Sequence, residues 1–323
     1  MEQGHCIRLR ETGGPDVLSY EPLDLAAPGP GEVRIAVQAS GINFIDTYHR
    51  TGLYPVKLPF IPGVEAVGVV EALGEGVDDV SLGDRVGYLG AGGYATHLNA
   101  PASRLIPLPD TISDDDAAAI LLKGLTAWML LFEVKQPRPG DTVLIWAPVG
   151  GVGSLLVPWA RSLGAHVIAV TSTEGKAERA RALGAEHVLM RQDDIAGAVR
   201  DLTGAAGVDI VYDSVGKASQ DASLAALKSR GWWITYGNAS GPAAPLAPGR
   251  LGQLGSLVMT RPSLFHFIPD RQSLMAGASA LLGAVSAGTL QPSISGTWGL
   301  HQAAEAQTRL ESGATQGALI LKP

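Results

Sequence analysis

The chain has very little cysteine, few aromatic residues and a modest share of charge. Its 323 residues include one cysteine, Cys6, and only 6% aromatic side chains. A single cysteine excludes a disulfide framework and any zinc site that needs several thiolates. Lys and Arg number 24 against 31 Asp and Glu, which gives a net charge of −7. We therefore do not expect a nucleic acid as partner, because its phosphates require basic residues.

Long apolar runs are also missing. The most apolar stretch, residues 117–132, is interrupted by Lys123 and Gly124, and we expect it to be too short to span a bilayer. The N-terminus lacks the basic start and apolar stretch of a signal peptide. These features predict a cytoplasmic protein with no membrane partner.

Glycine and proline are plentiful, and they punctuate short strand-like patterns in the first third of the chain. Such patterns occupy residues 33–37, 64–70, 83–88 and 93–97. Their regular spacing predicts a small β-barrel or sandwich. Ser113, followed by three aspartates, then predicts a helix that runs towards Phe132 and is disturbed near Gly124.

A different pattern begins at Thr142, where strands alternate with helices. The strands are expected at residues 142–146, 166–170, 186–190, 209–212 and 232–236. Apolar strands that alternate with helices indicate an α/β domain with a doubly wound parallel sheet covered on both faces. The tail after about residue 288 contains short strands and one helix, and we expect it to return to the first domain.

A glycine-rich turn follows the first of these strands. Residues 148–153, Pro-Val-Gly-Gly-Val-Gly, fit the pattern G-x-G-x-x-G with Pro148 in the first position. Small residues there allow backbone N–H groups at a helix N-terminus to approach a pyrophosphate. The strand before it and the helix after it favour a dinucleotide site over a tight turn without a ligand.

The end of the second strand predicts which dinucleotide is bound. NAD sites usually have a carboxylate there, whereas this chain has Ser172 and Thr173, with Lys176 three residues later. Two hydroxyls and an ammonium can bind a 2′-phosphate, which favours NADPH. Glu174 stands against this interpretation, because its carboxylate could bind the ribose.

Several longer segments carry a resemblance to a known family. They are residues 41–48 (GINFIDTY), 52–55 (GLYP), 122–126 (LKGLT), 150–153 (GGVG), 211–216 (VYDSVG), 237–238 (GN), 255–257 (GSL), 260–264 (TRPSL) and 314–317 (ATQG). Over nearly its whole length the chain resembles the zinc-independent quinone oxidoreductases of the medium-chain dehydrogenase/reductase family. The resemblance implies a GroES-like β-barrel catalytic domain (1–121 and 286–323), a Rossmann NADPH-binding domain (122–285) and a homodimer.

The resemblance also accounts for the missing zinc ligands. Zinc-dependent relatives have Cys and His where this chain has Gly41-Ile42-Asn43 and Gly63-Val64-Glu65. Glu65 alone cannot hold zinc, so we expect no catalytic metal.

Site residues follow from the resemblance position by position. It places the nicotinamide near Asn43, Asp46, Tyr48, Lys123, Thr126, Val215, Pro262, Ser263 and Leu264. The pyrophosphate is expected at Gly151 and Val152, within the cofactor-binding turn that also contains Gly150 and Gly153. The adenosine phosphate is expected at Ser172, Thr173, Lys176 and Arg191, and the cofactor groove is lined by Asn238, Ala239, Ser240 and Gly241. The catalytic candidates are Asn43, Tyr48 and Tyr54, beside the substrate.

Arg191 stands where relatives have a Tyr, and Gly313 where they have an Arg, so the first change strengthens the phosphate pocket and the second weakens it. Asn43 is expected either to polarise a substrate carbonyl or to hold the carboxamide of the cofactor.

The resulting hypothesis is an NADPH:quinone reductase that works without a metal, with its substrate in the interdomain cleft. A quinone accepts electrons readily and its reduced oxygens are weakly basic, so neither zinc nor a strong acid is required. One alternative is an NADPH-dependent reductase of activated alkenes, such as enones or enoyl thioesters. A second is an NADPH-binding protein with little turnover, structural or RNA-binding.

Overall fold

The computed structural model describes residues 4–323, and their contacts divide the chain into two compact units. Unit 1 consists of the chain up to Leu125, Ile268–Leu281 and Pro292–Pro323. Unit 2 consists of Thr126–Phe267 and Leu282–Gln291. Residues 268–281, which the sequence analysis placed in the nucleotide-binding domain, lie in unit 1. Arg104 Nη1 donates to the Ile268 carbonyl at 2.6 Å, and Arg271 Nη1 donates to the Leu105 carbonyl at 3.1 Å.

Unit 1 is mainly β-structure. Its strands are β1 (Gly4–Leu9), β2 (Leu18–Leu23), β3 (Glu32–Ile42), β4 (Glu65–Leu73), β5 (Arg85–Leu89), β6 (His97–Pro101), β7 (Leu105–Pro107), β14 (Ile294–Gly299) and β15 (Ala318–Lys322). Its helices include α1 (Phe44–Thr51) and α10 (Ala303–Glu311), with short 3-10 turns at Pro15–Val17, Ala102–Arg104 and Leu300–Gln302.

The long strand β3 organises this unit. The main sheet has the order β14-β15-β3-β4-β5-β7, with β6 also paired to β3, and β1 and β2 form a separate hairpin. The C-terminal strand β15 pairs antiparallel with β3, so both ends of the chain contribute to one sheet. Alternate residues of β3, including Val33, Ile35 and Val37, are buried in one core cluster. The strand expected at residues 93–97 was wrong, because β6 begins only at His97. Before it, Tyr94 and Thr96 lie in bends and Ala95 forms an isolated bridge with Cys6.

The apolar helix after residue 113 is continuous through Gly124. It comprises α2 (Asp114–Trp128) and a π-helical turn at Met129–Val134, so the expected disturbance lies later than Gly124. Together they span 21 residues. We had expected this stretch to be too short to cross a membrane, and that expectation was wrong. By length and composition it could do so, but 78% of its most apolar window is buried in the protein. Such burial is typical of a core helix, and the helix is weak support for a membrane span.

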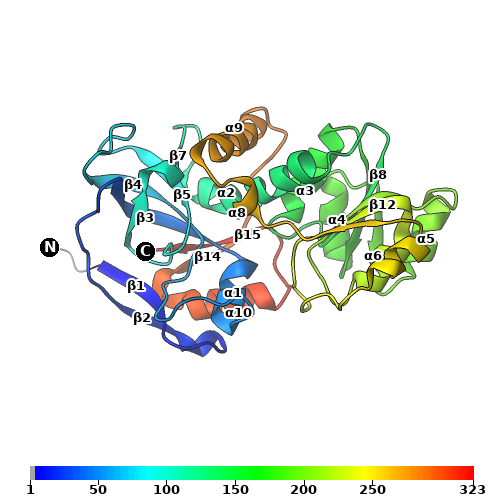
Figure 1. Ribbon diagram of the computed structural model, residues 1–323, viewed down its shortest axis with the longest axis horizontal. Coiled ribbons are helices and arrows are strands. Elements are labelled where there is room, and N and C mark those ends of the chain that lie inside the picture. Colours follow the sequence, from blue (N-terminus) through cyan, green and yellow to red (C-terminus); the bar gives the residue numbers. More distant parts are fainter. Residues whose placement is uncertain (1–3) are drawn as a thin grey trace. The chain divides into compact units, whose positions relative to one another are not determined.

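Unit 2 contains six parallel strands and the helices that connect them (Figure 1). The strands are β8 (Thr142–Trp146), β9 (His166–Thr171), β10 (His187–Met190), β11 (Val208–Asp213), β12 (Leu227–Thr235) and β13 (Val258–Thr260). The helices are α3 (Gly153–Ser162), α4 (Glu174–Ala182), α5 (Ile195–Leu202), α6 (Gln220–Ala226), α7 (Pro248–Gln253) and α8 (Leu264–Phe267); α9 (Arg271–Ser286) contains the boundary at Leu281.

The strand order β10-β9-β8-β11-β12-β13 is the doubly wound order of a Rossmann domain. From β8 the chain first adds strands on one side (β9, β10) and then on the other (β11, β12, β13). This change of side creates a topological switch point at the carboxyl ends of the neighbouring strands β8 and β11. Ligands of such sheets bind at this edge. The predicted Rossmann fold is therefore confirmed.

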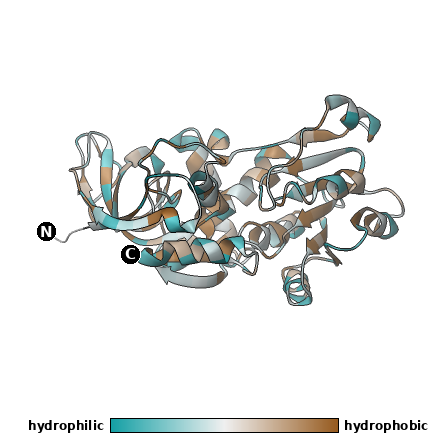
Figure 2. Ribbon diagram, turned by 90° about the horizontal axis from the view of Figure 1, so that it is seen from below, coloured by the Kyte–Doolittle hydropathy of each residue, from teal (hydrophilic) through white to brown (hydrophobic). Residues whose placement is uncertain are grey.

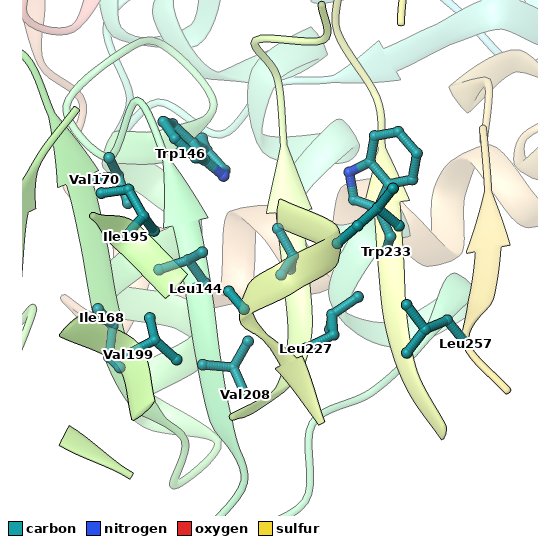
Figure 3. Packing of buried hydrophobic residues seen from close by; sticks show 13 residues of the cluster. Leu144, Trp146, Ile168, Val170, Ile195, Val199, Val208, Leu227, Trp233 and Leu257 are labelled. Carbon is teal, nitrogen blue, oxygen red and sulfur yellow. The ribbon is translucent and has the colours of Figure 1, made fainter. Parts of the chain in front are cut away.

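One face of this sheet carries a hydrophobic core of unit 2. Leu144, Ile168 and Val170 from the strands meet Ile195 and Val199 from α5 (Figure 3). Because strand side chains alternate in direction, residues two apart, such as Leu144 and Trp146, face the same side. Helices in both units mix hydrophilic and hydrophobic residues (Figure 2), as expected of helices with one buried face.

Candidate functional site

The candidate cofactor residues of unit 2 gather at one edge of the parallel sheet. Each group begins within about four residues of the carboxyl end of a strand, and these ends share an edge because the strands are parallel. The groups are Gly150–Gly153 after β8, Ser172 and Thr173 after β9, Arg191 after β10, Val215 after β11, Asn238–Gly241 after β12 and Pro262–Leu264 after β13. Thr126 lies in α2 instead.

The glycine-rich turn brings backbone into very close approach. Ala147 adopts a positive φ of 51°, and the Gly150 N–H donates to its carbonyl at 3.1 Å. A Cβ at Gly153 would lie 2.2 Å from the Ala147 carbonyl oxygen, so only glycine fits there. By contrast, a Cβ at Gly150 would meet nothing closer than 3.4 Å. The turn leads directly into α3, where the N–H groups of Ser154 and Leu156 donate to the carbonyls of Gly150 at 2.8 Å and Val152 at 2.9 Å. The N–H groups that precede them, at residues 151–153, can hold an anion.

Two cationic side chains lie close together beyond β9 and β10. Lys176 is in the first turn of α4, and the exposed Arg191 follows β10, where its N–H donates to the Thr171 carbonyl at 2.8 Å. Burial and the nearby Arg191 guanidinium lower the pKa of Lys176. Because an anion placed beside both cations would relieve their repulsion, this corner of the sheet edge fits a phosphate.

Glu174, whose carboxylate was the argument against a bound 2′-phosphate, forms an ion pair within its own helix. Glu174 Oε1 accepts a hydrogen bond from Arg181 Nη1 at 2.9 Å along α4. This exposed ion pair contributes little stability, but it directs the Glu174 carboxylate towards the helix surface.

Asp213, which the sequence analysis did not single out, accepts hydrogen bonds from several groups around it. Its carboxylate is fully buried at the end of β11 and accepts the N–H groups of Val215 at 2.9 Å and Gly216 at 3.1 Å. It also accepts Trp233 Nε1 at 3.1 Å and the hydroxyls of Ser219 and Ser223. These bonds fix the turn that carries Val215.

The loop after β12 is bonded to this turn. The Ser240 N–H donates to the Val215 carbonyl at 2.9 Å, and the Ala239 N–H donates to the Ser214 carbonyl at 3.2 Å. A Cβ at Gly237 would lie 2.3 Å from the Ser214 carbonyl oxygen, which requires glycine at this crossing. The structure therefore brings together two of the predicted loops, residues 214–216 and 237–241.

In unit 1 the candidate residues form a buried polar network. Glu65, at the start of β4, has no exposed surface, and its Oε1 accepts Asn43 Nδ2 at 2.7 Å and Lys123 Nζ at 2.9 Å. Its Oε2 accepts the Leu122 N–H at 2.8 Å. Asn43 also donates to the Gly41 carbonyl at 3.2 Å, so both N–H bonds of its amide are used. Breaking a buried ion pair of this kind costs about 3–5 kcal/mol.

Asp46 lies next to this network, in the first turn of α1. Its Oδ2 accepts the Asn43 backbone N–H and the Tyr94 hydroxyl, both at 2.9 Å. Its Oδ1 is buried and has no hydrogen-bond partner among the described residues. Burial raises the pKa of Asp46 to about 7, against the bonds from Asn43 and Tyr94; Glu65 raises it further, and Lys123 opposes this.

A pH-dependent stability follows from Asp46. Since its native pKa lies above its ordinary value of 3.8, the stability that the neutral carboxyl contributes is complete below about pH 4 and is lost as the pH rises through about 7. We expect the free energy of unfolding to fall, through this group, by up to about 4 kcal/mol over that window. Asp46→Asn should abolish this dependence in urea titrations at successive pH values. Asp16→Asn is the control, because Asp16 is exposed, and it should leave the pH dependence unchanged. A dependence that survives Asp46→Asn, or that Asp16→Asn removes, would contradict this assignment.

The two candidate tyrosines lie on α1 and just after it. The rings of Tyr48 and Tyr54 meet edge to face with centroids 5.2 Å apart, and the Tyr54 N–H donates to the Tyr48 carbonyl at 3.0 Å. Tyr48 is buried and Tyr54 is half-buried. Asn43, Asp46, Lys123 and both tyrosines thus lie in unit 1, as one group of candidates.

The sequence analysis missed three members of the two networks: Glu65, Tyr94 and Asp213. Glu65 had been considered only as an insufficient zinc ligand. Asp213 had one usable signal, since a charged residue that ends an apolar strand must find partners. Tyr94 had none. In residues 4–323 no group of three or more His, Cys, Asp or Glu side chains could hold a metal ion.

Comparisons with known proteins agree with this architecture. Residues 29–110 match the alcohol dehydrogenase GroES-like domain, and residues 151–278 match the family described as zinc-binding dehydrogenase. The chain is 43% identical to a 2-haloacrylate reductase of a Burkholderia species, with 98% of each protein covered. It is 41% identical to a quinone oxidoreductase of Salmonella typhimurium, covering 98% of this chain and 99% of that protein.

A solved structure extends the likeness to three dimensions. The Escherichia coli quinone oxidoreductase complexed with NADPH matches with a TM-score of 0.96 at 38% identity, over 99% of this chain and all of that one. The likeness covers the full length, the GroES-like domain and the Rossmann domain, as the resemblance implied. The chain therefore belongs to the quinone oxidoreductases of the medium-chain dehydrogenase/reductase family.

Proposed function

We propose that the protein is an NADPH-dependent oxidoreductase that reduces quinones without a metal. The observation that carries this proposal is the likeness to quinone oxidoreductases over the whole chain, with a close structural match to one complexed with NADPH. The glycine turn, the paired cations and the buried network of unit 1 supply the local features that such a reaction needs.

The residues of unit 2 fit the phosphates of NADPH. The N–H groups of Gly151 and Val152 in the turn, and of Gly153 at the start of α3, would hold the pyrophosphate, since the turn leaves no room for a side chain at Gly153. Lys176 and Arg191 would hold the 2′-phosphate, with the hydroxyls of Ser172 and Thr173 as further donors. The loops at 214–216, 238–241 and 262–264 would line the remaining groove.

The paired cations give a direct prediction about cofactor choice. Lys176→Ala should weaken NADPH binding about 10- to 100-fold, because one charge-assisted hydrogen bond contributes about 1.5–3 kcal/mol. NADH binding should change less than about twofold, since NADH lacks the 2′-phosphate. Fluorescence titration of both cofactors measures this.

Arg191→Ala should behave like Lys176→Ala in the same titrations. Lys228→Ala is the matched control, because Lys228 lies near the amino end of β12, at the opposite edge of the sheet, where it pairs with Asp209. Equal loss of NADPH and NADH affinity in Lys176→Ala would show that the side chain does not read the 2′-phosphate.

In unit 1 the network would serve the reacting end of the cofactor and the substrate. Bound NADPH supplies the hydride. Tyr48 and Tyr54 offer ring faces and edges against which a flat quinone can stack. Lys123 and Asn43 are held in place by Glu65, so their polar atoms are oriented before any ligand arrives. Quinone oxygens become only weakly basic on reduction, so water can protonate them.

Activated alkenes are the second candidate substrates. The specific observation in their favour is the 43% identity to a 2-haloacrylate reductase over 98% of the chain. NADPH oxidation with 1,4-benzoquinone, a larger ortho-quinone, a simple enone and 2-chloroacrylate separates the two proposals. We expect rapid oxidation with quinones. Turnover of the enone or the acrylate alone would assign the protein to alkene reduction, and binding without turnover would leave a cofactor-binding protein.

We further propose a homodimer located in the cytoplasm. Strand β13 is at the edge of the parallel sheet and, within residues 4–323, pairs with β12 alone, while Val258 and Met259 are more than one third exposed. An apolar edge strand can extend a sheet across a two-fold axis. Light scattering should give about twice the chain mass of 33.4 kDa, and a monomer would refute the dimer.

A further inference from the structure

The buried Glu65 carboxylate has an orienting effect on the Asn43 amide. A primary amide has two N–H donors, and those of Asn43 go to Glu65 Oε1 at 2.7 Å and to the Gly41 carbonyl at 3.2 Å. Both donors are therefore used, and the group that the amide has left to offer a ligand is its oxygen. Asn43 cannot polarise a substrate carbonyl in this state, because that would require a free N–H.

Lys123 is the complementary partner. Its ammonium has three N–H donors, and in residues 4–323 its Nζ donates only to Glu65 Oε1, at 2.9 Å. Glu65 Oε1 thus fixes two side chains at once, because it accepts from both the Asn43 amide and the Lys123 ammonium. The Asn43 oxygen remains as an acceptor, and the Lys123 ammonium remains as a donor. A primary carboxamide offers one carbonyl acceptor and one NH₂ donor, which is the reverse set.

The carboxylate has no freedom to reorient. Glu65 is fully buried, and a Cβ at Gly41 would lie 1.9 Å from its Oε1 and 2.5 Å from the Ala118 carbonyl oxygen. The Leu122 N–H holds Oε2 at 2.8 Å. Three N–H groups, from Asn43, Lys123 and Leu122, donate to the Glu65 side chain and together use both of its oxygens. A carboxylate has two acceptor oxygens, whereas a glutamine amide has one.

We propose that Glu65 is a positioning residue that sets Asn43 as acceptor and Lys123 as donor for the carboxamide of the nicotinamide. This inference rests on the proposed function, because it takes NADPH as the ligand. Through Glu65 the site distinguishes a carboxamide NH₂ from a group of similar size that cannot donate.

The test compares NADPH with its 3-acetylpyridine analogue, in which a methyl group replaces the NH₂. The wild-type protein should bind the analogue about three- to tenfold more weakly, which is the effect of one hydrogen bond. Glu65→Gln should remove this difference, because the glutamine NH₂ faces at least one donor and allows the Asn43 amide to turn. Adenosine 2′,5′-bisphosphate, which lacks the nicotinamide, should bind both proteins equally.

Glu71→Gln is the matched control, since Glu71 is on the same strand but 35% exposed, and it should keep the discrimination. If Glu65→Gln does not fold, Asn43→Ala, which leaves the Glu65–Lys123 pair in place, should show the same loss. Discrimination that persists in a folded Glu65→Gln protein, or in Asn43→Ala, overturns the proposal. A wild type that binds NADPH and its analogue equally overturns it too, while the proposed function stands. A wild type that binds neither NADPH nor the bisphosphate overturns the proposed function itself.

Discussion

Asp213→Asn should lower the free energy of unfolding by about 2–4 kcal/mol, since each buried donor left without an acceptor costs about 1–3 kcal/mol. The carboxylate accepts the Val215 and Gly216 N–H groups on Oδ1 and Trp233 Nε1 on Oδ2. An asparagine has one oxygen, so its NH₂ must face one of these donors, and none of them can reverse. Urea unfolding measures the loss.

The same substitution should also weaken NADPH binding, because the turn at Val215 is bonded to the loop at Ser240. Asp209→Asn is the matched control on strand β11. It is partly exposed and accepts one backbone N–H, from Thr142 at 3.0 Å, besides its pair with Lys228. We expect this control to lose no more than about 1.5 kcal/mol. Equal losses of unfolding free energy at the two positions would show that the several hydrogen bonds of Asp213 stabilise the fold no more than the contacts of Asp209.

Gly153→Ala should reduce NADPH affinity at least about tenfold and destabilise the fold by about 1–3 kcal/mol, the usual cost of overpacking. Its Cβ would lie 2.2 Å from the Ala147 carbonyl oxygen and 2.8 Å from the Pro148 carbonyl carbon. These are backbone atoms, so the turn itself has to move, and with it the N–H groups at the start of α3. Thermal unfolding and cofactor titration measure the two effects.

Gly150→Ala serves as the control for stability. It lies in the same turn, has no positive φ and would place its Cβ 3.4 Å from the nearest atom. We expect its free energy of unfolding to stay within about 0.5 kcal/mol of the wild type. If Gly150→Ala destabilised the protein as much as Gly153→Ala, steric contact at Gly153 would not explain the requirement for glycine.

Local patterns made much of the fold predictable. The strand, glycine turn and helix from Thr142 to Ser162 are adjacent in sequence, and the alternation continues to β12, so the parallel sheet could be inferred without tertiary information. The candidate cofactor residues of unit 2, apart from Thr126, were predictable for the same reason, since each group lies in a loop that follows a strand.

Two local predictions failed because tertiary packing overrode them. Gly124 was taken as a disturbance of α2, yet the helix continues through it. A Cβ there would lie 2.4 Å from Leu281 Cδ1, so this glycine provides room for a neighbouring helix. The alternation at residues 93–97 resembles a strand, but a Cβ at Gly93 would lie 2.3 Å from the Glu65 carbonyl oxygen. That glycine marks a close backbone approach before β6 begins.

The network of unit 1 could not be predicted because its partners are far apart in sequence. Glu65 meets Lys123 across 58 residues, and Asp46 meets Tyr94 across 48. Nothing in the neighbourhood of either carboxylate reveals these partners. The role of Asn43 had been left open between polarising a substrate carbonyl and holding the carboxamide of the cofactor, and the contacts of its amide with Glu65 and Gly41 favour the second.

The most direct test of NADPH-dependent quinone reduction is the initial rate of cofactor oxidation by 1,4-benzoquinone, measured with NADPH and with NADH after dialysis against a metal chelator. We predict a kcat/KM for NADPH at least about tenfold above that for NADH, in line with one charged contact to the 2′-phosphate. Chelation should leave the rate unchanged. A chain that binds NADPH but oxidises it with no quinone, or only after a metal is added, would contradict the account.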